Sequence, residues 1–144
     1  MAAATFRMRR SLSWGHCDPA GIIFYPTYYR WMDAATWSLL AECGWPGERM
    51  RAENLSIPLL DSQCSFLASP KFGDEIEVRS ALERIGRSSF ALRHEFFLLG
   101  AQEKLLARGL EARVWARYEA GPGTTLRSTP VPDALRAALG GAPA

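Results

Sequence analysis

The sequence predicts an α+β fold in which one long central helix is wrapped by a curved antiparallel sheet of about five strands. Two patterns carry this prediction. A strongly amphipathic segment opens with a proline, and several later segments alternate apolar with charged residues at hairpin-like spacing. A long apolar helix needs a large apolar surface to cover it, and a curved sheet supplies that surface.

Composition narrows the class of protein before any motif is considered. The chain has 144 residues, which favours a single domain over residues 1–144, and its formal net charge of +2 gives no broad basic field for nucleic acid. Three irregularly spaced cysteines form neither a disulfide framework nor a paired metal motif, and they fit a reducing compartment. Without a signal-peptide pattern or an apolar run of roughly 20 residues, we expect a cytoplasmic protein that does not span a membrane.

The first expected elements are a strand and the long helix. Residues 5–13 alternate apolar and polar side chains, which is typical of a strand. After a loop over residues 14–25, Pro26 stands where a first helical residue needs no N–H donor. Apolar side chains then recur at helical spacing as far as Cys43, and Gly44 follows as the residue that ends the helix.

The second half of the chain predicts strands and a short closing helix. Apolar and charged residues alternate through most of it, and turn-forming residues separate the segments. The expected strands span residues 61–69, 74–84, 88–99 and 105–119, and the helix spans 132–140. The last two strands are long, which indicates one large curved sheet.

The alternation also assigns side chains to the two faces of the sheet. His94 is in register with apolar neighbours, so we expect a hydrogen-bonded histidine on the inward face. On the last strand Glu111 and Arg113 are expected to face away from the core. The residues of that strand expected to face the core are Leu106, Leu110, Ala112, Val114, Ala116 and Tyr118. The large apolar side chains left on the second face or at the edges indicate a partner subunit, and they are Phe97, Leu99 and Trp115.

The loop before the long helix contains a carboxylate in an unusual place. The stretch WGHCDPAGIIFYP puts Asp18 a few residues ahead of the helix start. The N–H groups and positive dipole of a helix N-terminus can hold a developing oxyanion. A nearby carboxylate can attack a carbonyl or deprotonate water. The spacing permits a minimal acyl-transfer site, and it leaves open that Asp18 only caps the turn that Pro19 begins.

The segment GHCDPAGIIFYPTYYRWMDAA resembles the signature of the 4-hydroxybenzoyl-CoA thioesterase family of hotdog-fold proteins. It is less similar to the related short-chain acyl-CoA thioesterases, whose loop has a pattern such as DTDAGGVVYHANY. The resemblance continues more weakly through RSSFALRHEF and LRSTPVP and covers most of the chain. It implies a hotdog fold and a hydrolase for aromatic acyl-CoA thioesters, of the hydroxybenzoyl or benzoyl type, that acts in aromatic degradation.

The resemblance also implies roles for individual residues. Asp18 would be the catalytic nucleophile or general base, and the backbone N–H of Tyr25 would polarise the thioester carbonyl. Asp33 and Trp31 would contact the acyl group, with Asp33 accepting a hydrogen bond from an aryl hydroxyl. A solvated helix carboxylate is the alternative for Asp33. His16 stands where the family commonly has an acid, and it either lowers the pKa of Asp18 when protonated or has no chemical role.

The phosphates of coenzyme A need cationic or hydrogen-bonding partners. The resemblance places these contacts at Arg87, Ser88 and Arg127. The family turn is richer in basic residues, and Gly86 and Ser88 stand where basic side chains are expected. The resemblance implies no metal and no cofactor, because coenzyme A is part of the substrate.

Other functions remain open from the sequence. One is a short-chain or branched aliphatic acyl-CoA thioesterase, and another is a hotdog module that binds acyl-CoA without turnover. Hydratase chemistry is disfavoured because the predicted helix over 26–43 contains no histidine. The resemblance implies a homodimer or homotetramer, with sheets paired edge to edge and each site built from both chains.

Overall fold

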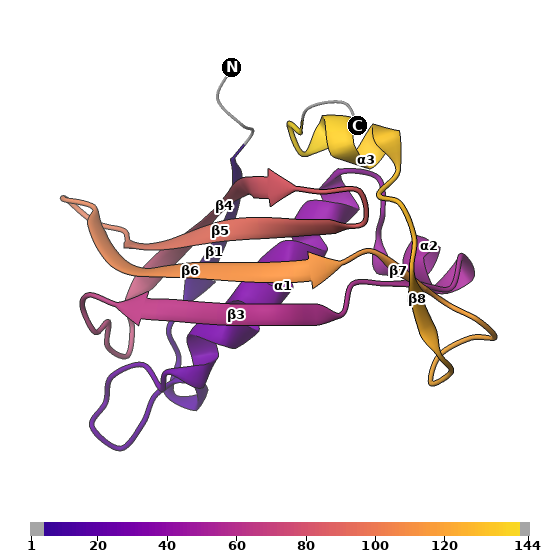
Figure 1. Ribbon diagram of the computed structural model, residues 1–144. Coiled ribbons are helices and arrows are strands. Elements are labelled where there is room, and N and C mark those ends of the chain that lie inside the picture. Colours follow the sequence, from indigo (N-terminus) through magenta and orange to yellow (C-terminus); the bar gives the residue numbers. More distant parts are fainter. Residues whose placement is uncertain (1–4, 142–144) are drawn as a thin grey trace.

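The central feature of the molecule is a five-stranded antiparallel sheet with one long helix across its face (Figure 1). The computed structural model describes residues 5–141. The strands lie in the order β1-β4-β5-β6-β3. Their bounds are β1 (Phe6–Ser11), β3 (Leu59–Phe66), β4 (Glu75–Ile85), β5 (Ser89–Leu98) and β6 (Lys104–Val114). The predicted α+β architecture, with its long helix and about five strands, is confirmed.

Helix α1 (Pro26–Glu42) begins and ends close to the predicted positions. Pro26 is its first residue, where a missing N–H removes no helical hydrogen bond. Gly44 follows the helix with a φ of 96°, a conformation that glycine adopts at little cost. The residues that α1 buries are Thr27, Tyr28, Trp31, Met32, Ala35, Thr36, Leu39 and Leu40.

Helix α1 approaches the sheet closely at Gly109 on β6. A Cβ atom built on Gly109 would lie 2.6 Å from Sδ of Met32. Met32 is fully buried, so the absence of a side chain at residue 109 makes room for the helix. This glycine inside a strand therefore marks a close contact between helix and sheet.

Several short elements were not predicted. They are the 3-10 helix η1 (Trp14–His16), helix α2 (Gly47–Ala52), and the strands β2 (Leu55–Ser56) and β8 (Leu126–Ser128) of a second sheet. The third strand of that sheet, β7 (Ala116–Tyr118), was predicted as the end of one strand over residues 105–119, and this prediction is wrong because the chain leaves the large sheet at Trp115. Elements of two to six residues are too short to show a period in the sequence. The closing helix α3 (Asp133–Ala138) lies within its predicted range. Among residues 5–141, no helix is both long and apolar enough to cross a membrane.

The predicted facing of β6 is wrong from Leu110 onward. The pairing of β5 with β6 shifts at Leu106, because Phe96 pairs with Ala107 while Phe97 pairs with Leu105. One extra residue in a strand reverses which side chains face the core. Beyond this bulge Glu111 is 3% exposed and Arg113 is 6% exposed. The half-buried residues there are Leu110, Ala112 and Val114.

Trp115 is a core residue, and its predicted place on a second face or at an edge is wrong. It is 1% exposed, because the reversed alternation turns it inward. Its ring meets that of Trp45 edge-on, with centroids 6.2 Å apart. It belongs to the apolar cluster under the C-terminal half of α1, together with α3 residues such as Leu135. Phe97 is half-buried, with the guanidinium of Arg79 4.0 Å from its ring centroid.

Candidate active site

Asp18 lies in a closed loop directly before α1. Its Oδ1 atom accepts a hydrogen bond from the Ala20 N–H at 2.8 Å. Its own N–H donates to the Ile22 carbonyl, and its carbonyl accepts from the Gly21 N–H, both at 2.9 Å. The turn-capping contact is therefore present. Within residues 5–141 the Oδ2 atom accepts no hydrogen bond, which leaves it available for chemistry.

The start of α1 supplies a free hydrogen-bond donor. The N–H of Phe24 donates to the His16 carbonyl at 2.8 Å, and the N–H of Tyr28 donates to the Tyr25 carbonyl at 3.1 Å. In the described part of the chain, the N–H of Tyr25 itself donates to no atom. This group is therefore free at the positive end of the helix dipole.

Asp18 and Tyr25 line one cleft of about 360 Å³. The remaining lining is largely apolar and consists of Ile22, Ile23, Phe24, Tyr28, Phe66, Ala68 and Ser69. An apolar wall weakens the screening of charges by water, so interactions with a developing oxyanion are stronger there. The structure thus brings the two predicted catalytic groups to the same cleft.

The far wall of the cleft was missed by the sequence reasoning. Phe66, Ala68 and Ser69 lie about fifty residues beyond Asp18 in the chain, and no local motif connects them. Tyr28 was recognised only as part of the apolar helix stripe. Burial, with a smaller effect from nearby Cys64, raises the pKa of Tyr28 well above its ordinary value, so its hydroxyl stays protonated.

His16 and Trp31 lie beside the cleft rather than in it. The Nδ1 atom of His16 accepts a hydrogen bond from the Ser13 N–H at 3.0 Å, which ties the ring to the turn of η1. The ring of His16 meets that of Trp31 edge-on, with centroids 5.2 Å apart. Trp31 is buried in the core, because α1 turns this face toward the sheet. Its predicted place in the substrate pocket is not seen within this chain.

Asp33 lies outside the cleft of its own chain. It stands eight residues beyond Tyr25, roughly 12 Å along the helix axis. Its side chain is 56% exposed, and its Oδ1 atom accepts a hydrogen bond from Nη2 of Arg113 at 2.8 Å. Asp33 and Asp18 therefore do not meet within one chain.

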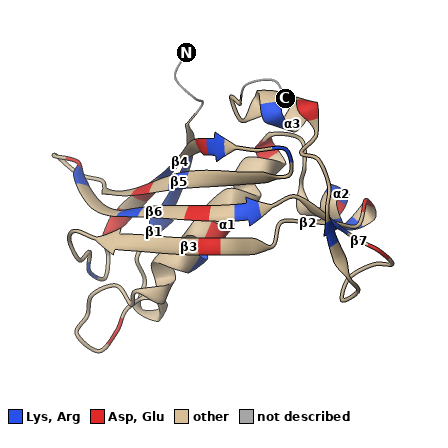
Figure 2. Ribbon diagram, viewed as in Figure 1, with Lys and Arg blue, Asp and Glu red and all other residues tan. Residues whose placement is uncertain are grey.

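A buried polar network lies beneath Asp33, near the end of β6 where Figure 2 shows an acidic band beside a basic one. Arg113 donates from Nε and Nη2 to the two carboxylate oxygens of Glu111, both at 3.1 Å. Its Nη1 atom donates to the Ile57 carbonyl at 3.0 Å. Burial alone would raise the pKa of Glu111, but hydrogen bonds from His94 and Arg113 and the charge of Arg113 hold it below its ordinary value.

His94 connects this network to the middle of the sheet. Its Nδ1 atom lies 2.6 Å from the Ser80 hydroxyl, and its Nε2 atom lies 3.4 Å from the Glu111 carboxylate. The hydroxyl of Thr36 on α1 also contacts Glu111. The prediction of a hydrogen-bonded histidine on the inward face is confirmed.

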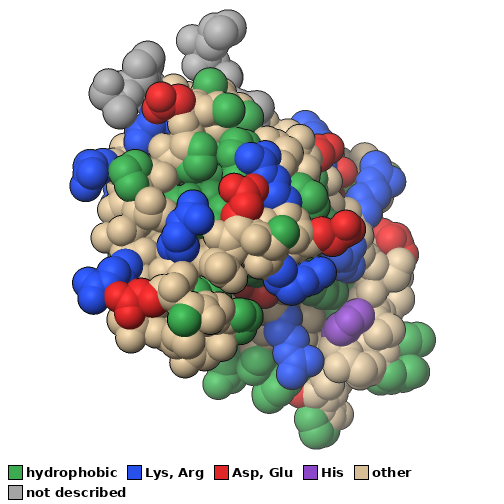
Figure 3. Space-filling model, turned by 90° about the vertical axis from the view of Figure 1, so that its right-hand side faces the viewer, with side chains coloured by type: hydrophobic (Ala, Val, Ile, Leu, Met, Phe, Trp, Pro, Cys, Tyr) green, Lys and Arg blue, Asp and Glu red, His purple; other side chains and the backbone are tan. Residues whose placement is uncertain are grey.

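The residues predicted to contact coenzyme A lie at the opposite end of the sheet from the Asp18 loop (Figure 1). The carbonyl of Arg87 accepts from the Val131 N–H at 2.9 Å, and that of Ser88 accepts from the Trp115 N–H at 2.7 Å. Arg127 on β8 is exposed and forms an ion pair with Glu119. Basic side chains are spread over this side of the molecule (Figure 3). These three residues share one end of the molecule, away from the cleft.

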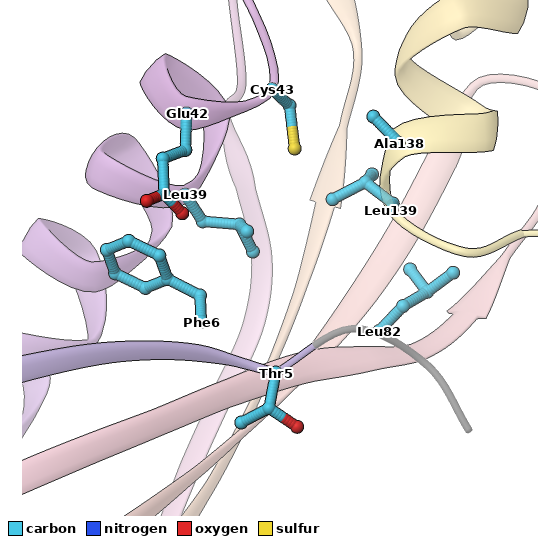
Figure 4. A pocket seen from close by; sticks show the side chains of 8 residues that line it. All are labelled: Thr5, Phe6, Leu39, Glu42, Cys43, Leu82, Ala138 and Leu139. Carbon is cyan, nitrogen blue, oxygen red and sulfur yellow. The ribbon is translucent and has the colours of Figure 1, made fainter.

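Two other cavities carry no comparable pair of catalytic groups. One, of about 380 Å³, lies between β1, α1, β4 and α3, where mainly apolar side chains converge (Figure 4). Burial, with the charge of Glu42, raises the pKa of Cys43 there, which disfavours a reactive thiolate. The other, of about 550 Å³, is lined by Trp37, Arg51 and Tyr118 among others. No cluster of three His, Cys, Asp or Glu side chains within residues 5–141 is placed to hold a metal ion.

Known proteins resemble the chain over nearly its whole length. The sequence model of the thioesterase-like superfamily matches residues 12–139. The 4-hydroxybenzoyl-CoA thioesterase of Pseudomonas sp. (strain CBS-3) is 31% identical over 135 residues, which cover 90% of this chain and 94% of that protein.

Solved structures resemble the chain in the same way. An Asp-to-Asn variant of 4-hydroxybenzoyl-CoA thioesterase, in complex with 4-hydroxybenzoyl-CoA, has a TM-score of 0.84 at 27% identity and covers 94% of this chain and 98% of that one. A gentisyl-coenzyme A thioesterase has a TM-score of 0.78 at 31% identity and covers 94% and 99%. These likenesses confirm the predicted hotdog fold.

Proposed function

The chain belongs to the thioesterase-like superfamily, and we propose that it hydrolyses an aromatic acyl-CoA thioester of the hydroxybenzoyl or benzoyl type. The observation that carries this proposal is a cleft lined by both Asp18 and Tyr25. Within residues 5–141 the Oδ2 atom of Asp18 accepts no hydrogen bond and the N–H of Tyr25, at the helix start, donates none. The names of two similar proteins support the acyl class, because 4-hydroxybenzoyl and gentisyl groups are both hydroxylated benzoyl groups.

The chemistry needs only water and groups of the chain itself. Asp18 attacks the thioester carbonyl carbon directly or removes a proton from an attacking water. Negative charge develops on the carbonyl oxygen, and the Tyr25 N–H and the α1 dipole stabilise it, one such donor contributing roughly 3–4 kcal/mol. The C–S bond then breaks and coenzyme A leaves as the thiol, its sulfur taking a proton from Asp18 on the water route and from solvent water on the direct route. On the direct route a water hydrolyses the mixed anhydride, so both routes give the free acid.

A second copy of the chain would complete the site. Among residues 5–141, strand β3 is an edge of the sheet and pairs on one side only, with β6. Unpaired edges favour association with another strand. The exposed large apolar side chains of β3 and the segment after it are Leu59, Leu60, Phe66 and Leu67. We therefore propose a homodimer or homotetramer in which two β3 strands pair antiparallel.

This pairing would join the separated groups. Phe66, at the end of β3, lines the Asp18 cleft, whereas Leu59, at its beginning, pairs with Arg113, which holds Asp33. Antiparallel pairing about a two-fold axis sets the beginning of one β3 beside the end of the other. The partner's Asp33 would then approach the Asp18 cleft, with the partner's coenzyme A-binding end on the same side.

We expect sedimentation velocity at micromolar concentration to show a dimer or tetramer of the wild type. Replacing Leu60 by arginine puts a charge where the proposed pairing would bury an apolar side chain, so it should shift the chain toward monomer. The rate of thiol release should fall as the dimer dissociates, because each site would lose the groups that the partner subunit contributes. Ala120→Arg, in the exposed β7–β8 hairpin, is the matched control. A fully active monomer would contradict the shared site.

Asp33 supplies the feature that favours a hydroxylated ring. Only its Oδ1 atom is engaged, by Arg113, and within residues 5–141 its Oδ2 atom accepts no hydrogen bond. Trp37 lies one helical turn further along α1 and lines the cleft of about 550 Å³, so a flat apolar surface adjoins the acceptor. An aromatic ring with a hydroxyl group matches both.

A thiol-release assay with 4-hydroxybenzoyl-, benzoyl- and butyryl-CoA tests the proposed substrate. We expect kcat/KM for 4-hydroxybenzoyl-CoA to exceed that for benzoyl-CoA by about tenfold or more, because a hydrogen bond to a charged acceptor contributes about 1.5–3 kcal/mol. Butyryl-CoA should be the poorest substrate. A clear preference for butyryl-CoA would establish the aliphatic alternative, and tight binding of all three without turnover would establish a binding module.

A further inference from the structure

Arg113 is a buried cation that the chemistry above does not use. It donates four hydrogen bonds, two to Glu111, one to the Ile57 carbonyl and one to Asp33. A buried guanidinium is costly unless a carboxylate neutralises it, and Glu111 alone meets that need. The hydrogen bond to Asp33 is therefore not needed to neutralise Arg113. It connects the buried Arg113–Glu111 pair to an exposed carboxylate at the surface.

The carboxylate of Glu111 has further contacts besides those with Arg113. The Nε2 atom of His94 lies 3.4 Å from its carboxylate, and Ser80 lies 2.6 Å from the opposite ring nitrogen. Thr36 approaches the same carboxylate from α1. All these side chains are buried, so the Glu111 carboxylate has little freedom to move.

The network connects to Asp33 from both the helix and the sheet. Thr36 and Asp33 are three residues apart on α1, so they lie on neighbouring positions of one helix face. Arg113 comes from β6, and the Ile57 carbonyl comes from the segment that leads into β3. The Asp33 carboxylate is thereby placed relative to the same edge strand that we propose as the subunit contact.

We propose that Arg113 is a positioning residue for recognition of the acyl group, holding Oδ1 of Asp33 so that Oδ2 faces the aryl hydroxyl of the substrate. Glu111 and His94 hold Arg113 in turn. This inference rests on the proposed function, in which Asp33 accepts the hydrogen bond from that hydroxyl. An acceptor already fixed in place loses less conformational freedom when substrate binds, which favours the hydroxylated ring over the plain one.

The ratio of kcat/KM for 4-hydroxybenzoyl-CoA to that for benzoyl-CoA tests the role of Arg113. Arg113→Lys keeps the charge but loses the planar fork that reaches Glu111, Asp33 and Ile57 together. We expect the ratio to fall from about tenfold or more to within about threefold, the loss of one charged hydrogen bond. The value of kcat/KM for benzoyl-CoA should stay near that of the wild type.

Asp33→Asn is the reference variant. Combining it with Arg113→Lys completes a double-mutant cycle. If Arg113 acts only through Asp33, Arg113→Lys should cause no further loss of the ratio once Asp33 is asparagine. A purely structural role for Arg113 would instead lower kcat/KM for both substrates alike and leave the ratio unchanged, which would overturn the inference. Arg93→Lys, at the exposed pair with Glu83, is the matched control and should leave both substrates unaffected.

A second variant keeps the test valid if Arg113→Lys does not fold. Replacing Glu111 and Arg113 together by glutamine removes both charges and leaves no buried carboxylate unpaired. In this variant too, the ratio of kcat/KM for 4-hydroxybenzoyl-CoA to that for benzoyl-CoA should fall to within about threefold. If Asp33→Asn abolishes the ratio while both changes at Arg113 preserve it, the inference fails and the proposed function stands. If Asp33→Asn leaves the ratio unchanged, or if the wild type releases no thiol, the proposed recognition or activity fails and this inference fails with it.

Discussion

Replacing Asp18 by asparagine is expected to abolish thioester turnover while leaving the binding of CoA esters measurable. Asparagine retains an oxygen that can accept the Ala20 N–H, so the loop should keep its shape. It cannot attack a carbonyl or remove a proton from water. A positioned general base contributes roughly 10²–10⁴-fold, so we expect kcat to fall at least about 100-fold in a thiol-release assay.

The control for this experiment is the same substitution at an exposed acid. Asp133, at the start of α3, lies at the opposite end of the molecule from the Asp18 loop. Asp133→Asn should leave kcat within about twofold of the wild type, since exposed positions away from the site have small effects. Equilibrium binding of 4-hydroxybenzoyl-CoA to Asp18→Asn would show that the site is intact. Normal turnover in Asp18→Asn would refute the proposed chemistry.

Replacing Trp115 by alanine is expected to cause a large loss of stability. The side chain is 1% exposed and packs in the cluster that joins α1, α3 and the sheet. Removing so large a buried side chain typically lowers the free energy of unfolding by about 3–5 kcal/mol, because the surrounding residues relax only in part. Urea unfolding at a fixed protein concentration measures this loss.

Trp14 offers the matched control for this substitution. It is 65% exposed and stacks on Phe72 with centroids 4.2 Å apart. Trp14→Ala should lower the free energy of unfolding by about 1 kcal/mol, the worth of one exposed aromatic pair. If Trp115→Ala were equally mild and instead changed the oligomeric state, Trp115 would be an interface residue after all.

The long helix and the loop before it could be predicted because their determinants are local. Pro26 and Gly44 mark the helix ends through their own backbone preferences. Asp18 and the Tyr25 N–H lie seven residues apart, so one short motif contains both. A motif of that length cannot include Phe66, at the end of β3, or Ser69, in the segment after it, which complete the cleft.

The facing of β6 shows where alternation fails as a guide. Leu106 and Ala107 are both buried. From the sequence, either the even-numbered or the odd-numbered residues of β6 could therefore face the core. The bulge opposite Phe96 settles the phase, because β5 pairs with β6 on both sides of it. Charged residues such as Glu111 seemed to belong outside, yet their mutual pairing allows them to be buried.

The amino-acid sequence therefore determined the long strands, the helices α1 and α3, the ends of α1 and the acid and amide that we place in the reaction, since each depends on neighbours within one or two turns of chain. Tertiary structure was needed for the walls of the cleft, for the burial of Trp115 and for the hydrogen bond from Arg113 to Asp33. These features join residues up to 80 positions apart. Their geometry depends on strand register and on the packing of α1, and a single bulge can reverse it.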